Sequence, residues 1–248
     1  MDRKYWEKIA PDYNNEIFDV LHNDKKAIIR KAINRLGSRH HIVLDAGCAV
    51  GKWLPVLSPA FKKVIAADIS AKNLDIAKAN YQDFSNIDYL RVDMSSPGLR
   101  LPKVDVVVCI NAILTSSMKK RDAFFSNISR CTKKHGSLIL VVPSLESYMF
   151  TRIIQDKWKI DRDVLPATPS PAQGLEKYKN SFQGNFDIDN VSTKHYLREE
   201  LEVLLSREGF ATDKFQKIEY SWKTEFNNPP KWLKDPKPWD WMVVGRKM

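Results

Sequence analysis

Three acidic residues stand where hydrophobic segments end. Asp45 and Asp68 each close such a segment, and Asp93 lies two positions beyond another. If the segments are parallel strands, their carboxyl ends share one edge of a sheet, which is where open α/β sheets bind ligands. A carboxylate at the second strand end can accept two hydrogen bonds from the vicinal hydroxyls of a ribose. The spacing of 21 positions from Gly47 to Asp68 is close to the roughly 20 expected for that geometry.

A glycine-bearing turn follows Asp45. The residues Asp45-Ala-Gly-Cys-Ala-Val-Gly51 lead from a hydrophobic segment into a predicted helix near Trp53. Glycine allows a tight turn and lets a ligand approach the backbone closely, although strand-to-helix turns also need glycine for structural reasons. The pair Asp93-Met94 adds a carboxylate for an exocyclic amine and a thioether that can pack on an aromatic base. Together, these features predict a nucleoside-like ligand at this edge.

The elements that must position these residues alternate regularly. Short β-branched runs alternate with longer amphipathic stretches, as expected of strands covered on both faces. This pattern predicts a doubly wound, Rossmann-like α/β fold, with a seven-stranded, mostly parallel sheet, helices on both faces and a lid insertion. The predicted strands are 41–45, 64–68, 87–91, 104–109, 137–142, 212–220 and 239–245, and the clearest predicted helices are 24–35, 71–81 and 118–132.

We expect residues 1–248 to form a single domain. Its predicted parts are a helical lead-in (1–39), a core that binds the ligand (40–144), a lid or substrate insertion (145–191), and a closing helix with the last two strands (192–248). The insertion is rich in aromatic residues and proline, and hydrophobic periodicity is lost there. The closing helix is predicted to start at Ser192 or Thr193 and to run to Glu208 before Gly209.

Composition narrows the class of protein. The 248 residues carry a formal net charge of +10, and they contain neither a long apolar segment nor a hydrophobic leader. The three cysteines have no metal-binding or disulfide-framework spacing. We therefore expect a cytoplasmic protein with no bound metal and no membrane partner. The basic residues are spread along the chain, as on ordinary solvated faces, so they raise the prospect of an anionic partner without establishing one.

Taken together, these motifs resemble those of class I S-adenosylmethionine-dependent methyltransferases. The resemblance covers 6–142 well and the tail 196–245 more loosely; it rests on the lead-in Trp6-Glu-Lys-Ile-Ala-Pro-Asp-Tyr13, on the glycine loop and on the acidic strand ends. It also includes the segment 104–110 followed by Asn111, and the tail 197–210.

The resemblance implies S-adenosylmethionine as cofactor and S-adenosylhomocysteine as product. Gly47 and the neighbouring loop would hold the methionine moiety, and Tyr13 would close over it. Asp68 would hold the ribose, Asp93 and Met94 the adenine, and Asn111 would lie beside the sulfonium and the methyl group. The full set of implied cofactor residues is Tyr13, Asp45, Gly47, Cys48, Ala49, Gly51, Asp68, Ile69, Asp93, Met94 and Asn111.

One position departs from the family pattern. Ala49 replaces the middle glycine of the usual Gly-x-Gly-x-Gly loop, and we expect a modest backbone adjustment there. A dinucleotide-dependent dehydrogenase, the nearest alternative enzyme, would need Gly-x-Gly-x-x-Gly, which this loop lacks.

We expect a small-molecule methyl acceptor, bound under the insertion, and a monomer or homodimer. Tyr148, Trp158 and Phe186 are candidates for an aromatic acceptor pocket, although ordinary packing accounts for them almost as well. His195 is the candidate general base, with a surface histidine at the start of the closing helix as the plainer interpretation. Two alternatives remain: a tRNA or rRNA methyltransferase that uses the basic surface, and a non-catalytic S-adenosylmethionine-fold binding protein.

Overall fold

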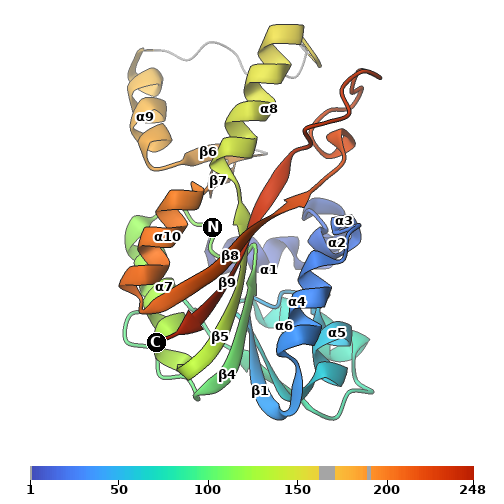
Figure 1. Cartoon of the computed structure of the whole chain (residues 1–248), viewed down its shortest axis with the longest axis vertical. Coiled ribbons are helices and arrows are strands. Elements are labelled where there is room, and N and C mark those ends of the chain that lie inside the picture. Colours follow the sequence, from blue (N-terminus) through green and yellow to red (C-terminus); the bar gives the residue numbers. More distant parts are fainter. Residues whose placement is uncertain (1, 162–170, 189–190) are drawn as a thin grey trace.

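A seven-stranded sheet forms the centre of the computed structural model, which describes residues 2–161, 171–188 and 191–248 (Figure 1). The strand order is β3-β2-β1-β4-β5-β9-β8. Strands β1 to β5 are mutually parallel, whereas β9 runs antiparallel to both β5 and β8. The strands are β1 (Ser38–Ala46), β2 (Phe61–Asp68), β3 (Ile87–Arg91), β4 (Val104–Ile110), β5 (Thr132–Pro143), β8 (Phe210–Glu219) and β9 (Trp239–Lys247).

Helices cover both faces of this sheet (Figure 1). One apolar core packs α4, α5 and α6 against one face, and the other packs α7 and α10 against the opposite face. Side chains of β1 alternate between them, with Val43 in the first core and Leu44 in the second, as the two-residue period of a strand requires. The helices in the described residues are α1 (Arg3–Ile9), α2 (Tyr13–Glu16), α3 (Val20–Asn23), α4 (Ile28–Leu36), α5 (Leu54–Ala60), α6 (Ala71–Asn80), α7 (Met118–Cys131), α8 (Leu145–Trp158), α9 (Pro171–Phe182) and α10 (Arg198–Arg207), with 3₁₀ turns η1 (Ala10–Asp12) and η3 (Trp222–Thr224).

The doubly wound, seven-stranded prediction is confirmed. The chain turns from β1 to β2 on one side and places β4 on the other side of β1, so the strand order reverses between β1 and β4. Such a reversal leaves a crevice at the carboxyl ends of the two strands. The predicted ligand edge therefore coincides with the switch point of the topology.

The region after β5 has more regular structure than its sequence suggested. It contains α8, α9 and a hairpin of β6 (Asn185–Ile188) and β7 (Val191–Lys194), all beyond the carboxyl edge of the sheet (Figure 1). Ser144 caps α8, because its hydroxyl accepts a hydrogen bond from the amide of Ser147. The proline cluster around Pro166 and Pro169 lies outside the described residues.

The predicted start of the closing helix is wrong. Ser192 and Thr193 belong to β7, and α10 begins only at Arg198. Pairing of β7 with β6 across the hairpin is a contact that local capping signals do not report.

The described part of the chain contains no helix with the length and apolar character needed to cross a membrane.

Candidate active site

A cavity of about 530 Å³ opens at the carboxyl edge, at the reversal between β1 and β4. It is bounded by the loop after β1, the ends of β2 and β4, the segment after β3, and the N-terminal helix. Its wall consists of Asp2, Arg3, Lys4, Trp6, Tyr13, Gly47, Ala49, Asp68, Ile69, Asn73, Asp93, Met94, Ser95, Ile110, Asn111, Ala112, Leu114, Thr115, Lys120 and Phe124.

The glycine loop takes a conformation that its sequence makes possible. Gly47 has φ +82°, and a Cβ at this position would lie 2.4 Å from the Cβ of Ala112. The tight approach to the segment after β4 therefore requires glycine. Ala49, at the position of the middle glycine of the family pattern, also has positive φ, at 48°. Alanine therefore holds a left-handed conformation here at some cost in strain.

Asp68 is nine-tenths buried at the end of β2 and faces the cavity. Its carboxylate accepts hydrogen bonds from the amides of Ala49 (3.0 Å) and Ser70 (2.8 Å). Burial raises the pKa of Asp68, while these N–H donors oppose the increase. The residue thereby fixes the glycine loop against the second strand and presents a strong hydrogen-bond acceptor at the cavity wall.

Asp45 lies beneath the loop rather than on the cavity wall. It is 3% exposed, and its Oδ2 atom has no hydrogen-bond partner among the described residues. Burial, together with the nearby charge of Asp68, raises the pKa of Asp45 to about 7. Near neutral pH this carboxyl group is therefore partly protonated.

The segments after β3 and β4 also contribute to the cavity wall. The Asp93 carboxylate accepts hydrogen bonds from the amide and the hydroxyl of Ser95, and the Met94 carbonyl accepts one from the side chain of Asn127. Asn111 has φ +47°, and its side-chain amide donates a hydrogen bond to the carboxylate of Asp240 at 3.0 Å. Asp240 also accepts from the hydroxyl of Tyr220, so strands β8 and β9 hold the end of β4 in place.

The N-terminal helix α1 covers the cavity. Arg3, Lys4 and Trp6 contribute to its wall, and the Trp6 ring lies 6.5 Å from that of Tyr13. Burial, and secondarily the charge of Asp68, raises the pKa of Tyr13, so its hydroxyl keeps a proton and remains a donor. Composition gave no signal for this cover, because α1 is short and every one of its residues is at least partly exposed.

Most of the predicted cofactor residues meet at this cavity. Eight of the predicted residues are on its wall, and Asp45, Cys48 and Gly51 are not; the eight are Tyr13, Gly47, Ala49, Asp68, Ile69, Asp93, Met94 and Asn111. Gly51 has a packing role, since a Cβ there would lie 2.6 Å from the Leu54 side chain. Sequence reasoning missed Trp6, Thr115, Lys120 and Phe124; the i, i+4 spacing of Lys120 and Phe124 on a predicted helix was the available signal.

The predicted acceptor residues lie elsewhere. His195 is 4% exposed, packs 4.7 Å from the Tyr148 ring, and lies outside the cavity wall. Burial, with the cations of Lys194 and Arg152, lowers the pKa of His195 to about 4, so its imidazole is neutral at pH 7. Phe186 joins the same aromatic group, 4.4 Å from Tyr148.

Trp158 is separated from that group. Its ring lies 5.2 Å from that of Trp232, in a tilted arrangement. Trp158 is ten residues along α8 from Tyr148, which corresponds to about 15 Å of helix. The structure therefore brings together two of the three predicted pocket aromatics, and places the third at the far end of the helix.

A family model described as methyltransferase domain matches residues 43–136, the span from β1 into β5 that carries the glycine loop, Asp68, Asp93 and Asn111. The chain has the domain and the fold of class I S-adenosylmethionine-dependent methyltransferases. The match excludes α1 and the region after β5, so the methyltransferase domain model does not cover the elements that surround the cavity from outside the sheet.

Solved structures share the fold of this methyltransferase domain at low sequence identity. A SAM-dependent methyltransferase from Methanosarcina mazei is 17% identical, with a TM-score of 0.63, over 88% of this chain and 97% of that one. The magnesium protoporphyrin IX methyltransferase of Synechocystis, solved with S-adenosylhomocysteine, is 15% identical, with a TM-score of 0.59, over 99% and 97% of the two chains. A SAM-dependent methyltransferase from Anabaena variabilis is 14% identical, with a TM-score of 0.64, over 99% and 93%. A comparison with curated protein sequences finds no significant match.

Proposed function

We propose that this protein transfers a methyl group from S-adenosylmethionine to a small-molecule acceptor. The observation that carries the proposal is the convergence of the glycine loop, Asp68, Asp93-Met94 and Asn111 on one cavity at the strand-order reversal.

Two features of the cavity fit the donor. Gly47 contributes backbone without a side chain to the cavity wall, because a Cβ there would collide with Ala112. Asp68 and Asp93 both contribute carboxylates to the cavity wall, and Met94 and Phe124 contribute apolar surface to it. The donor set of hydroxyls and an exocyclic amine in a nucleoside matches this arrangement of acceptors.

The roles of the residues follow from these positions. Asp68 would hold the ribose hydroxyls, Asp93 and Met94 the base, and the loop at Gly47 the amino acid part. When bound, the donor supplies a methyl group on a positively charged sulfur, which needs alignment with a nucleophile rather than further activation. Asn111, fixed through Asp240, would stand where donor and acceptor meet, and α1 would exclude water from that point.

The size of the cavity is that of a small-molecule site, as the proposed donor requires. About 530 Å³ lies within the range of roughly 300–1,000 Å³ typical of small-molecule sites. The neutral, buried His195 has no place in this wall, so the proposal needs no general base from it. An acceptor that is already unprotonated at the working pH satisfies this condition.

Calorimetry with S-adenosylhomocysteine tests the donor site. Asp68→Ala removes an acceptor of two hydrogen bonds, so affinity should fall by about ten-fold or more. Asp68→Asn retains the shape if the alanine variant unfolds, and it should also weaken binding because its Nδ2 cannot accept. Asp88→Asn is the matched control, since Asp88 lies on β3 in an exposed pair with Lys63. Unchanged affinity in both Asp68 variants would contradict the assignment.

A labelled-methyl screen then tests the acceptor. Wild-type protein and Asp68→Asn are incubated with methyl-labelled donor and separate pools of metabolites and of total RNA. Label that enters the metabolite pool with the wild type alone supports the proposal. Label that enters only the RNA pool identifies a nucleic-acid methyltransferase instead.

A further inference from the structure

A second recess adjoins the cavity beside Lys120. Its volume is about 470 Å³, and it shares three residues, Asp2, Thr115 and Lys120, with the cavity wall. The remaining lining residues are Tyr5, Ser116, Ser117, Val191 and Ser192. The segment after β4 thus separates a donor-sized cavity from a shallower recess, with Lys120 at their junction.

The recess is rich in hydrogen-bond donors. Lys120 and Phe124 lie on the same face of α7, with Phe124 one turn further along the helix, because positions i and i+4 align. Ser117 precedes α7, yet its hydroxyl makes no capping hydrogen bond. Hydroxyls and an ammonium group together form the kind of donor set that binds carboxylate or phosphate oxygens.

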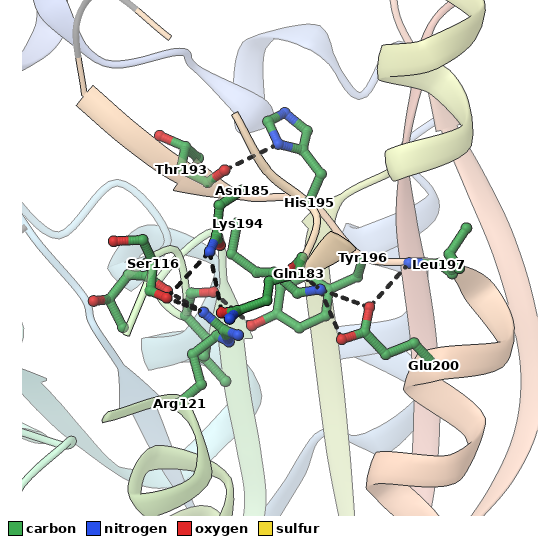
Figure 2. Close-up of polar contacts among 12 residues, drawn as sticks. Ser116, Arg121, Gln183, Asn185, Thr193, Lys194, His195, Tyr196, Leu197 and Glu200 are labelled. Carbon is green, nitrogen blue, oxygen red and sulfur yellow. Dashed lines mark hydrogen bonds and ion pairs between the residues drawn. The ribbon is translucent and has the colours of Figure 1, made fainter. Parts of the chain in front are cut away.

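The floor of the recess is held from below by buried polar side chains (Figure 2). The guanidinium of Arg121, 6% exposed, donates to the carbonyls of Thr115 (2.9 Å) and Ser116 (2.7 Å). The side chain of Asn185, 3% exposed, donates to the same Ser116 carbonyl at 3.3 Å. Several buried groups therefore fix a surface turn, which pre-organises its hydroxyls.

Strand β7 holds the same turn from the side. Thr193 forms an antiparallel bridge with Thr115, and the amide of Lys194 donates to the carbonyl of Leu114. The hydroxyl of Tyr196 donates to the carbonyl of Ile113 at 2.8 Å. The recess is consequently built from both the methyltransferase core and the insertion, so the insertion can determine which acceptor fits.

The charge beneath the recess is unbalanced. Within 2–161, 171–188 and 191–248, the cation of Lys194 pairs with Glu200, whereas Arg121 makes no ion pair with a carboxylate. A buried cation with only carbonyl partners lacks a counter-charge, and an anion in the recess would supply it. One carboxylate, that of Asp2, also lines the recess and interacts with the charge of Lys120. Lys120 in the lining and Arg121 beneath it supply two cations against this one carboxylate, which favours an anionic ligand.

We propose that this recess binds an anionic group, a carboxylate or a phosphate, of the methyl acceptor, while the nucleophile of that acceptor reaches into the adjoining cavity. The inference rests on the proposed function and specifies its substrate as an acidic small molecule. Lys120 is the specificity-determining residue, with Ser117 and Ser192 as hydroxyl partners.

Anion titration of the protein loaded with S-adenosylhomocysteine tests this proposal. Inorganic phosphate and succinate are added separately, and amide shifts are followed by NMR. We expect saturable shifts at 115–120 and 191–192 with at least one probe. Lys120→Gln should weaken that binding by about ten-fold, since one charge-assisted contact is lost. Lys119→Gln, on the same turn but outside both walls, should change it by no more than about two-fold.

The outcomes separate the two proposals. Response to phosphate alone indicates a phosphorylated acceptor, and response to succinate indicates a carboxylate; both support the recess. Non-saturable shifts, or equal losses in Lys120→Gln and Lys119→Gln, overturn it while leaving the donor site intact. Failure of S-adenosylhomocysteine to bind defeats the proposed function instead. A short single-stranded RNA is added as a third probe. If it shifts protein amides well beyond the recess, the small-molecule assignment is overturned.

Discussion

At the scale of single residues, the two carboxylates at neighbouring strand ends have different tasks. Asp68 makes defined hydrogen bonds and faces the cavity, whereas Asp45 lies behind the loop with one oxygen unpartnered. The sequence predicted that both would stand at the edge, because hydrophobic runs end there. It could not predict which of them reaches the cavity, since that depends on how the loop from Gly47 to Gly51 folds over Asp45.

Asp45 should make the ligand-free protein less stable as pH rises, which is the reverse of what a carboxylate with a lowered pKa does. Its folded pKa of about 7 exceeds the ordinary value of 3.8, so the folded state binds more protons between these values and stability is lost as pH rises through that window. At about 1.4 kcal/mol per pKa unit, Asp45→Asn should therefore raise the free energy of unfolding at pH 8 by a few kcal/mol, and the thermal midpoint with it, with a much smaller effect near pH 4. Thermal unfolding at both pH values measures this.

Asp105 supplies the control of opposite sign. Although partial burial opposes it, the amide of Ile42 and the ammonium of Lys133 lower the pKa of Asp105. Asp105→Asn should accordingly destabilise the protein at pH 8, and the loss should shrink as pH falls through the folded pKa. An Asp45→Asn variant that loses stability at pH 8 to the same extent as Asp105→Asn would contradict the burial argument.

At the scale of elements, the cover α1 is joined to the core by one carboxylate. Glu7 accepts hydrogen bonds from the amides of Ala71 (2.9 Å) and Lys72 (3.4 Å) at the start of α6. This helix begins directly after Asp68, Ile69 and Ser70, so the attachment of the cover lies beside the predicted ribose site. Movement of α1 would therefore open the cavity at the donor end.

Glu7→Ala should loosen the cover without unfolding the sheet. Loss of the two hydrogen bonds should increase hydrogen exchange in α1 and speed release of S-adenosylhomocysteine by roughly three- to ten-fold. Stopped-flow dissociation and exchange of the α1 amides provide the measurements. Glu16→Ala, an exposed change on α2, should leave both unchanged. Faster release in both variants would mean that Glu7 has no special part in holding the helix.

At the scale of the whole molecule, predictability follows the range of the contacts. The alternating runs predicted the strands β1 to β4 and the helices α6 and α7, because each element is specified by its own apolar pattern. The start of α10 and the hairpin β6–β7 depend on pairing with distant segments, as in the bridge from Thr193 to Thr115. The same distant contacts build the recess, so the part of the site that concerns the acceptor was the part that the sequence could not predict.

The ion pair between Lys194 and Glu200 joins the hairpin β6–β7 to the closing helix α10. The Lys194 side chain is 2% exposed and that of Glu200 is 33% exposed, with 2.7 Å between their charged atoms (Figure 2). Glu200→Gln leaves a buried cation without its counter-charge, whereas Lys194→Met leaves a carboxylate that water can reach. Glu200→Gln should thus destabilise the protein more than Lys194→Met, by an amount within the roughly 3–5 kcal/mol typical of a broken buried pair.

The pH dependence of this difference identifies its cause. Burial lowers the pKa of Lys194, although Glu200 opposes the effect, so without Glu200 the lysine should lose its proton more readily. The cost of Glu200→Gln should shrink as pH rises toward 10, because a neutral amine needs no counter-charge, while the cost of Lys194→Met should stay nearly level. Chemical denaturation of both variants from pH 7 to 10 measures the two trends. Equal costs at every pH would show that the pair contributes through packing alone, and that its charge has no part in fixing the hairpin beside the recess.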